Sequence, residues 1–331
     1  MAGSSRRRKF GTALGLAGGA GAVAAVVAAL AQRRWIVDDD PCGPGGLQLP
    51  EGRTVRVAAD DGADLEVLVA GPAAGPTVVL PHCWGGTRAL WAAVARRLVE
   101  AGHQVVLYDH RGHGSSTMGS SPATVDQLGE DLKGVLEHLD LRDVVLAGHS
   151  MGGMTVQALA VNHPGVIDER VRAIVLAATS AKPLPRALAA SLVDRALGDA
   201  LLKPWAKNAI GLVLTRGAVG RKVHRAHVEA TRDAFFGTAG AVRSGFLVGM
   251  SNMDYREGLA SITVPTTVLV GTRDRLTPPR MARLLAELIP KAELIVLPDA
   301  GHMLPMEEPD AITQAILGHT SPAPESAAAQ R

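Results

Sequence analysis

The segment Gly148-His149-Ser150-Met151-Gly152 holds a serine between two glycines. The apolar run Val144–Ala147 precedes it, and the helical stretch Gly152–Asn162 follows it. A serine on a strand-to-helix turn has cramped backbone angles, so the residues two positions before and after it must be small. Such a turn raises the serine hydroxyl above the edge of a sheet. We therefore predict that Ser150 is a nucleophile.

A serine hydroxyl becomes a good nucleophile only beside a base that a third group orients. Asp274 follows the apolar run Thr266–Val270, and His302 follows the run Glu293–Leu297. The ends of parallel strands would bring both side chains to the sheet edge that carries Ser150. Their order along the chain, serine then acid then histidine, is the order expected with this kind of turn. The prediction is a triad in which His302 is the general base and Asp274 orients it.

The elements that must position these residues alternate between short apolar runs and helical stretches. Strands are expected over Thr54–Ala58, Asp64–Val69, Thr77–Leu80, Gln104–Tyr108, Val144–Ala147, Arg172–Ala177, Thr266–Val270 and Glu293–Leu297. Helices are expected over Arg88–Ala101, Val125–Leu139 and Gly152–Asn162, the last closed by Pro164, and after His302. Strands that alternate with helices indicate a mostly parallel sheet with helices on both faces. The predicted fold class is α/β, with a doubly wound sheet.

The alternation stops between residues 181 and 255, which show no strand pattern and several charged helical stretches. A structureless loop of this length is rare in a compact domain, so the segment is predicted to be a helical cap inserted between two strands. The core then comprises residues 54–180 and 256–318. A cap above the C-terminal edge of the sheet would cover the place where such folds bind ligands. Residues 38–53 are expected to be a linker that lets the body stand clear of any membrane, and residues 319–331 a disordered tail.

The first 37 residues contain a basic cluster, Arg6–Lys9, followed by an uncharged stretch over residues 10–31. The 22 residues of this stretch are enough to cross a hydrocarbon core of roughly 30 Å, although alanine and glycine make the stretch weakly hydrophobic. Three interpretations stay open: a membrane anchor, a cleaved export signal that resembles the twin-arginine type, and a tail on a cytoplasmic protein. The first two place the body at a membrane or in the cell envelope, and the third is the alternative.

Charge and cysteine content bound the classes of function. Lys and Arg number 34 against 32 Asp and Glu, so no basic field is available to attract nucleic acid. Cys42 and Cys83 are far apart and form no cluster with metal-ligand spacing, while one disulfide between them stays open. His224 and His227 lie three residues apart, but the sequence shows no partner cluster beside them. No metal site and no cofactor are expected.

Five segments in order resemble those of the α/β-hydrolase family: His82–Gly86, Asp109–Ser115, the turn at Ser150, the turn at Asp274, and Gly301-His302. The resemblance covers residues 54–318. It implies that the backbone N–H groups of Trp84 and Met151 form an oxyanion hole. The chain departs from the family pattern at Cys83, which stands where glycine is usual, and glycine tolerates backbone angles that cysteine resists.

The resemblance also bears on residues beside the predicted site. His82 and His149 match positions that shape the loops in this family, and Arg111 and His113 are expected to brace the loop after Tyr108. Cys83 is expected to be a small buried side chain, because a reactive thiol needs an electropositive and exposed setting.

The predicted reaction is acyl transfer to water. His302 takes the proton of Ser150 as the hydroxyl attacks an ester or similar acyl carbon, and water then releases the acyl-enzyme. The substrate would be a small acyl compound, lipid-like if the body lies in the cell envelope. Alternatives on the same triad are cofactor-free haloperoxidase or perhydrolase activity and carbon–carbon bond hydrolysis. A non-catalytic binding protein is a further alternative, against which the complete triad argues. The sequence gives no indication of the oligomeric state.

Overall fold

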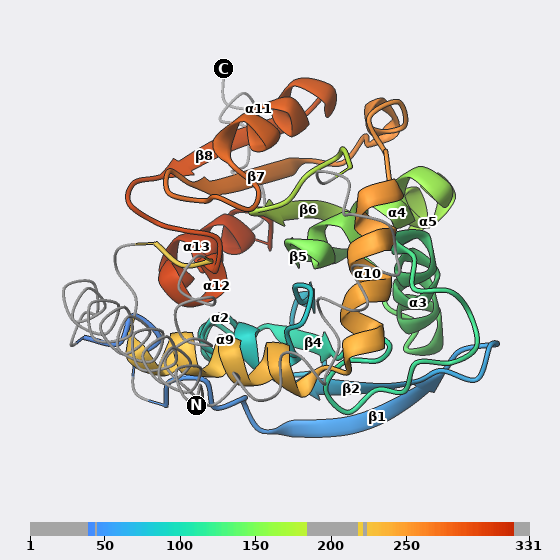
Figure 1. Cartoon of the computed structure of the whole chain (residues 1–331), viewed down its shortest axis with the longest axis horizontal. Coiled ribbons are helices and arrows are strands. Elements are labelled where there is room, and N and C mark those ends of the chain that lie inside the picture. The colour runs from blue at the N-terminus through green and yellow to red at the C-terminus, as the bar shows by residue number, and fades with distance from the viewer. Residues whose placement is uncertain (1–38, 44, 184–217, 221–223, 321–331) are drawn as a thin grey trace, which may run out of the picture.

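The structure is a computed structural model, and it describes residues 39–43, 45–183, 218–220 and 224–320 (Figure 1). An eight-stranded sheet runs through the body in the order β1-β2-β4-β3-β5-β6-β7-β8. Its strands are β1 (Gly52–Ala58), β2 (Asp64–Ala70), β3 (Thr77–Pro81), β4 (Gln104–Tyr108), β5 (Val144–His149), β6 (Val171–Ala177), β7 (Thr266–Gly271) and β8 (Ala292–Leu297). β1, β2 and β4 pair antiparallel, and all pairs from β4 to β8 are parallel. The predicted fold class and its eight strands are thereby confirmed.

The chain reverses its direction across the sheet at β3, since β4 lies on one side of it and β5 on the other. Loops after such a switch point diverge and leave a crevice at the carboxyl ends of the strands, where α/β folds bind ligands. The loop that begins at His82 follows β3, and Ser150 follows β5. The topology therefore brings the predicted oxyanion loop and the predicted nucleophile to neighbouring strand ends.

Helices cover both faces of the sheet (Figure 1). They are the 3-10 helix η1 (Arg88–Trp91), α2 (Ala92–Glu100), α3 (Val125–His138), α4 (Met151–Asn162), α5 (Pro164–Arg170), α9 (Arg225–Gly237), α10 (Gly240–Asn252), the 3-10 helix η2 (Leu259–Ser261), α11 (Pro279–Leu288), α12 (Leu304–Glu307) and α13 (Pro309–Thr320). Alternate side chains of each strand point to opposite faces. In β3, Val79 faces the core shared with α3 and α4, whereas Val78 and Leu80 face the core shared with α2 and α13. This two-sided burial explains why the central strands are almost wholly apolar.

Two helices differ from the sequence prediction. Pro164 does not only follow α4 but also begins α5, because proline fits the first position of a helix, where its missing N–H costs nothing. α11 was not among the expected helices. At the end of the body, α13 continues to Thr320 and so takes in the first two residues of the segment expected to be a tail, while residues 321–331 lie outside the described part.

The described part of the segment before β1 is packed onto the body. Arg97 donates to the carbonyl oxygen of Pro41 at 2.9 Å, and Arg96 donates to that of Gly46 at 2.8 Å. Cys42 is 2% exposed and joins a small apolar cluster with Met303 and Met306. Two arginines of α2 therefore hold the described residues between 39 and 51 on the body, while the role of residues 38–53 as a linker that sets the body clear of a membrane stays a prediction.

The described part of the segment between β6 and β7 contains two longer helices, α9 and α10, and α10 runs beside α3 (Figure 1). The predicted cap, residues 181–255, falls partly on residues 184–217 and 221–223, which lie outside the described residues. None of the helices in the described ranges is both long and apolar enough to cross a membrane. The predicted span over residues 10–31 lies outside the described residues.

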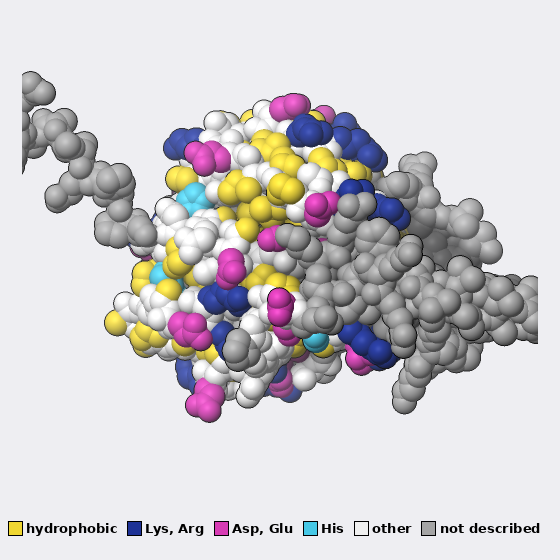
Figure 2. Space-filling model, turned by 90° about the vertical axis from the view of Figure 1, so that its left-hand side faces the viewer, with side chains coloured by type: hydrophobic (Ala, Val, Ile, Leu, Met, Phe, Trp, Pro, Cys, Tyr) yellow, Lys and Arg dark blue, Asp and Glu magenta, His cyan; other side chains and the backbone are white. Residues whose placement is uncertain are grey.

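At the other end of the sheet, β8 is only half covered. Ile295 and Val296 are 37% and 38% exposed. On the face shown in Figure 2, hydrophobic side chains gather in the upper part, over β8, with charged side chains around them. β8 differs in this respect from β5, in which every residue is buried.

Candidate active site

Ser150 lies on the sharp turn between β5 and α4 and has a positive φ of 54°. The neighbouring glycines are required by space. A Cβ on Gly148 would lie 2.4 Å from the carbonyl oxygen of Gly152, and a Cβ on Gly152 would lie 2.1 Å from that of Pro81. Such separations are far below van der Waals contact, so any larger residue would force the turn apart. The turn is therefore strained at Ser150 and held by close backbone packing, as a nucleophile elbow requires.

Hydrogen bonds fix the backbone of Ser150 on both sides. Its N–H donates to the carbonyl oxygen of Ala177 at 2.9 Å, and its own carbonyl oxygen accepts from Thr179 Oγ1 at 2.7 Å. Thr179 can approach because the neighbouring position of α4 is Gly153, where a Cβ would lie 2.8 Å from the threonine side chain. Both partners come from the end of β6 and the loop after it, so the sheet itself holds the nucleophile in place.

The three predicted triad residues lie together at the carboxyl ends of β5, β7 and β8. Ser150 Oγ is 2.9 Å from His302 Nε2, and His302 Nδ1 is 2.9 Å from Asp274 Oδ2. All three side chains are buried, with exposed fractions of 7%, 5% and 4% for Ser150, His302 and Asp274. With the imidazole proton on Nδ1 and donated to the carboxylate, Nε2 is free to accept the proton of Ser150. The arrangement has the geometry of a serine nucleophile, a base and an orienting acid.

Asp274 is surrounded by donors. Oδ1 accepts from the backbone N–H groups of Leu276 at 2.9 Å and Thr277 at 2.8 Å, and Oδ2 accepts from Thr277 Oγ1 at 2.8 Å. Burial alone would raise the pKa of this carboxyl, but the charge of His302 and these hydrogen bonds outweigh it and lower the pKa below its ordinary value. Asp274 therefore stays ionised and fixed in direction beside the imidazole.

Glu307, which the sequence reasoning missed, holds the loop that carries His302. Its carboxylate accepts from the backbone N–H groups of Gly301 at 2.8 Å and Met303 at 2.9 Å, on either side of the histidine. It also accepts from Gly220 of the inserted segment at 2.7 Å. Burial raises the pKa of Glu307 to about 7. In the sequence, the one indication of this role was the position of Glu307 inside the apolar stretch before α13, because buried carboxylates are rare unless they accept hydrogen bonds.

Two histidines beside the triad, His149 and His82, form hydrogen bonds that fix the tautomer of each ring. His149 Nε2 donates to the carbonyl oxygen of His302 at 2.7 Å, and burial lowers the pKa of His149 to about 3. His82 accepts from the backbone N–H of His110 through Nε2 at 2.9 Å, so its Nδ1 donates to the carbonyl oxygen of Cys83 at 2.8 Å. Burial lowers the pKa of His82 to about 4. Both rings are uncharged and occupied, which suits the loop-shaping positions expected from the sequence.

The loop after β3 is braced by the loop after β4. The N–H of Gly85 donates to His113 Nε2 at 3.1 Å, while His113 Nδ1 donates to the carbonyl oxygen of Arg111 at 3.0 Å. Arg111 is itself fully buried, and it donates to Asp131 at 2.6 Å and 2.7 Å and to Asp61 at 2.6 Å. Charge pairing on both sides explains how a guanidinium is tolerated inside the protein. The loop that carries Trp84 thus rests on an ordered polar network.

Cys83 does not distort this loop. It is not among the five described non-glycine residues that have a positive φ, so its backbone needs none of the freedom of glycine. The side chain is 5% exposed, and burial raises the pKa of the thiol to about 12. Cys83 is a small buried side chain with an uncharged thiol, and both cysteines are free rather than joined in a disulfide.

A pocket of about 490 Å³ lies between α10 and the residues that lead into α3. Its lining comprises residues 122–126 together with Ala241, Ser244, Gly245, Val248, Gly249, Asn252 and Met253. None of Ser150, Asp274 and His302 lines it. It is therefore distinct from the space in front of the nucleophile.

Comparison with known proteins identifies the fold family. The family model described as alpha/beta hydrolase fold matches residues 76–309. The chain is 29% identical over 246 residues to 3-oxoadipate enol-lactonase 2 of Acinetobacter baylyi, covering 74% of this chain and 89% of that protein. It is 27% identical over 271 residues to a bifunctional esterase/perhydrolase of Acinetobacter calcoaceticus, covering 79% and 97%.

A solved structure gives the same result for the fold. A hydrolase from Pseudomonas aeruginosa aligns with a TM-score of 0.68 and 30% identity, covering 82% of this chain and 99% of that one. The family match extends over more than half of the chain and includes the turn at Ser150, the turn at Asp274 and His302. This chain belongs to the alpha/beta hydrolase fold family.

Proposed function

We propose that this protein is a serine hydrolase that cleaves an ester, a lactone or a similar acyl bond, with Ser150 as nucleophile, His302 as general base and Asp274 as the orienting acid. The observation that carries the proposal is the pair of 2.9 Å contacts that link the three side chains on a strained strand-to-helix turn. Relatives named as an enol-lactonase, an esterase and a carbamate hydrolase support the choice of bond.

The reaction proceeds in two halves. In the first, His302 Nε2 takes the proton of Ser150 Oγ as the oxygen attacks the acyl carbon, and the imidazolium then protonates the leaving group. In the second, His302 takes a proton from water as the water oxygen attacks the acyl carbon, and the imidazolium returns this proton to Ser150 Oγ as the acid product leaves. Ionised Asp274 stabilises the imidazolium in both halves and keeps its Nδ1 proton in place.

The oxyanion of each tetrahedral intermediate is proposed to bind the backbone N–H groups of Trp84 and Met151. Support comes from the close approach of the two segments, since a Cβ on Gly152 would lie 2.1 Å from Pro81 O and 2.8 Å from His82 O. The start of α4 and the loop after β3 are thus in direct backbone contact. Preorganised donors of this kind stabilise developing charge without reorganisation, and each contributes about 3 kcal/mol.

The test is ester hydrolysis by the purified full chain. A series of p-nitrophenyl esters of rising acyl length, and a small lactone, are assayed with wild type and Ser150→Ala. The proposal predicts saturable hydrolysis of at least one substrate and a loss of about 10⁶-fold in kcat for the variant. Hydrolysis by a folded Ser150→Ala protein at the wild-type rate would refute the assignment.

Perhydrolase activity is a second candidate, favoured by the relative named as a bifunctional esterase/perhydrolase. Hydrogen peroxide would then replace water in attacking the acyl-enzyme on Ser150, with His302 again as base, and would release a peracid. Formation of peracetic acid from acetate or an acetyl ester plus peroxide distinguishes this reaction from simple hydrolysis.

The cellular location is proposed from the sequence alone. Residues 10–31 would anchor the body to a membrane or direct its export, with a cytoplasmic location as the alternative. Fractionation of cells that express the full chain, followed by intact-mass measurement, distinguishes a retained anchor from a cleaved signal and from a soluble chain of full length. A small acyl substrate is compatible with each location.

A further inference from the structure

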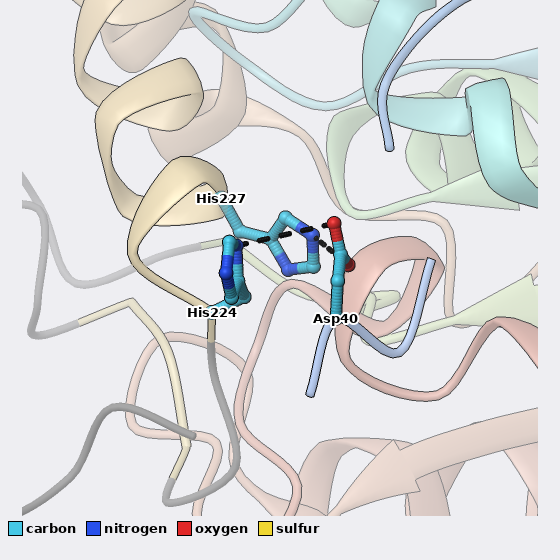
Figure 3. Close-up of side chains that lie close together, drawn as sticks. All are labelled: Asp40, His224 and His227. Carbon is cyan, nitrogen blue, oxygen red and sulfur yellow. Dashed lines mark ion pairs between the residues drawn. The ribbon is translucent and has the colours of Figure 1, made fainter. Parts of the chain in front are cut away.

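Three side chains with metal-binding chemistry converge at the start of α9 (Figure 3). Asp40 comes from the segment that precedes β1, whereas His224 and His227 flank the first turn of α9. His227 Nε2 is 2.7 Å from Asp40 Oδ1, and His224 Nδ1 is 3.9 Å from Asp40 Oδ2. The ligand atoms of all three residues lie within 4.8 Å of one another. Residues separated by more than 180 positions in the chain thus face a common point.

His227 is the key residue of this cluster because its ring is fully buried without a hydrogen bond. Its exposed fraction is 0%, and neither Nδ1 nor Nε2 has a hydrogen-bond partner among the described residues. The Nε2 atom is within 2.7 Å of a carboxylate oxygen but lacks hydrogen-bond geometry toward it. A fully buried imidazole that faces a carboxylate, and whose ring nitrogens lack well-directed hydrogen bonds, suits a shared cation.

The structure holds the first ligand in place from both sides. The N–H of Cys42 donates to Asp40 Oδ1 at 2.8 Å, and the arginines of α2 fix the carbonyl oxygens of the following residues. On α9, Thr231 Oγ1 donates to the carbonyl oxygen of His227 at 2.7 Å. His224 Nδ1 accepts only a long contact of 3.4 Å from the N–H of Ala226, which a metal bond would readily replace. Support of ligands by such outer contacts is typical of metal sites.

We propose that Asp40, His224 and His227 bind one divalent transition-metal ion of the zinc type. Two imidazole nitrogens and one carboxylate oxygen are a common ligand set for Zn²⁺, and in a tetrahedral site the ligand atoms lie about 3.4 Å apart. His227 Nε2 lies 2.7 Å from Oδ1 of Asp40 and His224 Nδ1 lies 3.9 Å from Oδ2, so the two imidazoles approach the same carboxylate at its two oxygens. His224 and Asp40 are partly exposed, with side-chain fractions of 30% and 24%, so the ion has an entry path and a position for water.

The ion would join two parts of the chain that already share an apolar cluster through Cys42 and Val228. One is the segment that leads from the N-terminal residues into β1, and the other is the first described helix of the inserted segment. The site stands apart from Ser150, Asp274 and His302 and takes no part in the proposed acyl transfer. Its role is to fix α9 to the segment that leads into β1.

The experiment uses the full chain, purified without a histidine tag and stripped with a chelator. Zn²⁺ alone is added, its stoichiometry is measured by equilibrium dialysis with elemental analysis, and its affinity is measured by competition with a chromophoric chelator. Wild type is expected to bind one Zn²⁺ per chain. Asp40→Asn and His224→Gln are expected to bind at least about 100-fold more weakly, because each loses a direct ligand.

A matched control is His163→Gln, which removes a histidine that also contacts a carboxylate, Glu130, at 2.6 Å but has no second histidine beside it. This variant is expected to bind Zn²⁺ as wild type does. Thermal unfolding supplies the second readout: Zn²⁺ raises the Tm of wild type and His163→Gln but not that of Asp40→Asn or His224→Gln, and all four match in excess chelator. Absence of stoichiometric binding to wild type, or equal affinity in the ligand variants, would overturn the proposal.

Discussion

Replacement of Asp274 by asparagine changes one atom of the site and reverses the direction of the hydrogen bonds at the Oδ2 position. Oδ1 of Asp274 accepts from two backbone N–H groups, those of Leu276 and Thr277, which cannot act as acceptors. The amide oxygen of the asparagine must therefore take the Oδ1 position. Its NH₂ group is then forced to the Oδ2 position, opposite His302 Nδ1.

The consequence is a change of tautomer in the base. An NH₂ donor at the Oδ2 position requires His302 Nδ1 to accept, which moves the imidazole proton to Nε2. Nε2 lies 2.9 Å from Ser150 Oγ and could then no longer take its proton. Wrong-tautomer substitutions of this kind lower kcat by about 10⁴-fold, equivalent to about 5 kcal/mol of activation free energy. The Thr277 hydroxyl, which now donates to Oδ2, can rotate to accept from the new NH₂, so the fold is expected to be preserved.

The assay is kcat/KM for the best p-nitrophenyl ester across pH 6 to 9, with circular dichroism to verify folding. Thr277→Val is the matched control, because it removes a donor to Asp274 Oδ2 but leaves the tautomer of His302 unchanged. A loss of no more than about tenfold is expected for this control. If folded Asp274→Asn keeps more than about a tenth of the wild-type activity at neutral pH, the assignment of Asp274 as the orienting acid is wrong.

Three further substitutions test the surroundings of the site. Because burial raises the pKa of Glu307 from 4.5 to about 7, its contribution to stability is full below about pH 4.5 and is lost as pH rises through 7. Urea unfolding measures the free energy of unfolding of wild type and of Glu307→Gln at each pH. The value for wild type minus that for the variant should fall by about 3 kcal/mol between pH 4.5 and 7, and a constant difference would contradict the raised pKa. Gly152→Ala should destabilise the protein by about 3 kcal/mol or more, since its Cβ would lie 2.1 Å from Pro81 O, and a Tm equal to wild type would show that the elbow is not tightly packed. Cys83→Ala should keep ester hydrolysis within about twofold, and wild type should resist iodoacetamide, because the thiol is buried and uncharged; rapid inactivation by alkylation would argue for a reactive thiol.

The sequence was sufficient for the sheet and for the grouping of the triad. Central strands such as β5 are buried on both faces, so their composition alone marks them. Ser150, Asp274 and His302 each follow such a run, and parallel strand ends meet at one edge. Their grouping therefore follows from the fold, while their catalytic roles remain a prediction that activity measurements must test.

Features that depend on contacts distant in sequence were not predictable. The docking of the segment around Cys42 depends on Arg96 and Arg97, which show no sequence signature because surface arginines are common on helices. Glu307 was missed because its role depends on three backbone donors that lie on two separate loops.

The histidine pair shows the same limit. Spacing alone gave His224 and His227 no third ligand, and the residue that completes the cluster, Asp40, is separated from them in the sequence by strands β1 to β6. The missed helix α5 has a local cause instead. Pro164 was interpreted as the end of the preceding helix, but proline can also begin a helix, so the sequence alone did not decide between the two.

Covalent labelling tests the central claim most directly. The full chain is treated with a fluorophosphonate at neutral pH, its intact mass is measured, and the modified residue is located by peptide mass spectrometry. The account predicts one adduct per chain, located on Ser150, and no adduct on Ser150→Ala or on folded His302→Ala within the same time. A well-folded wild-type protein that stays unlabelled, or that carries the adduct on another residue, would contradict the account.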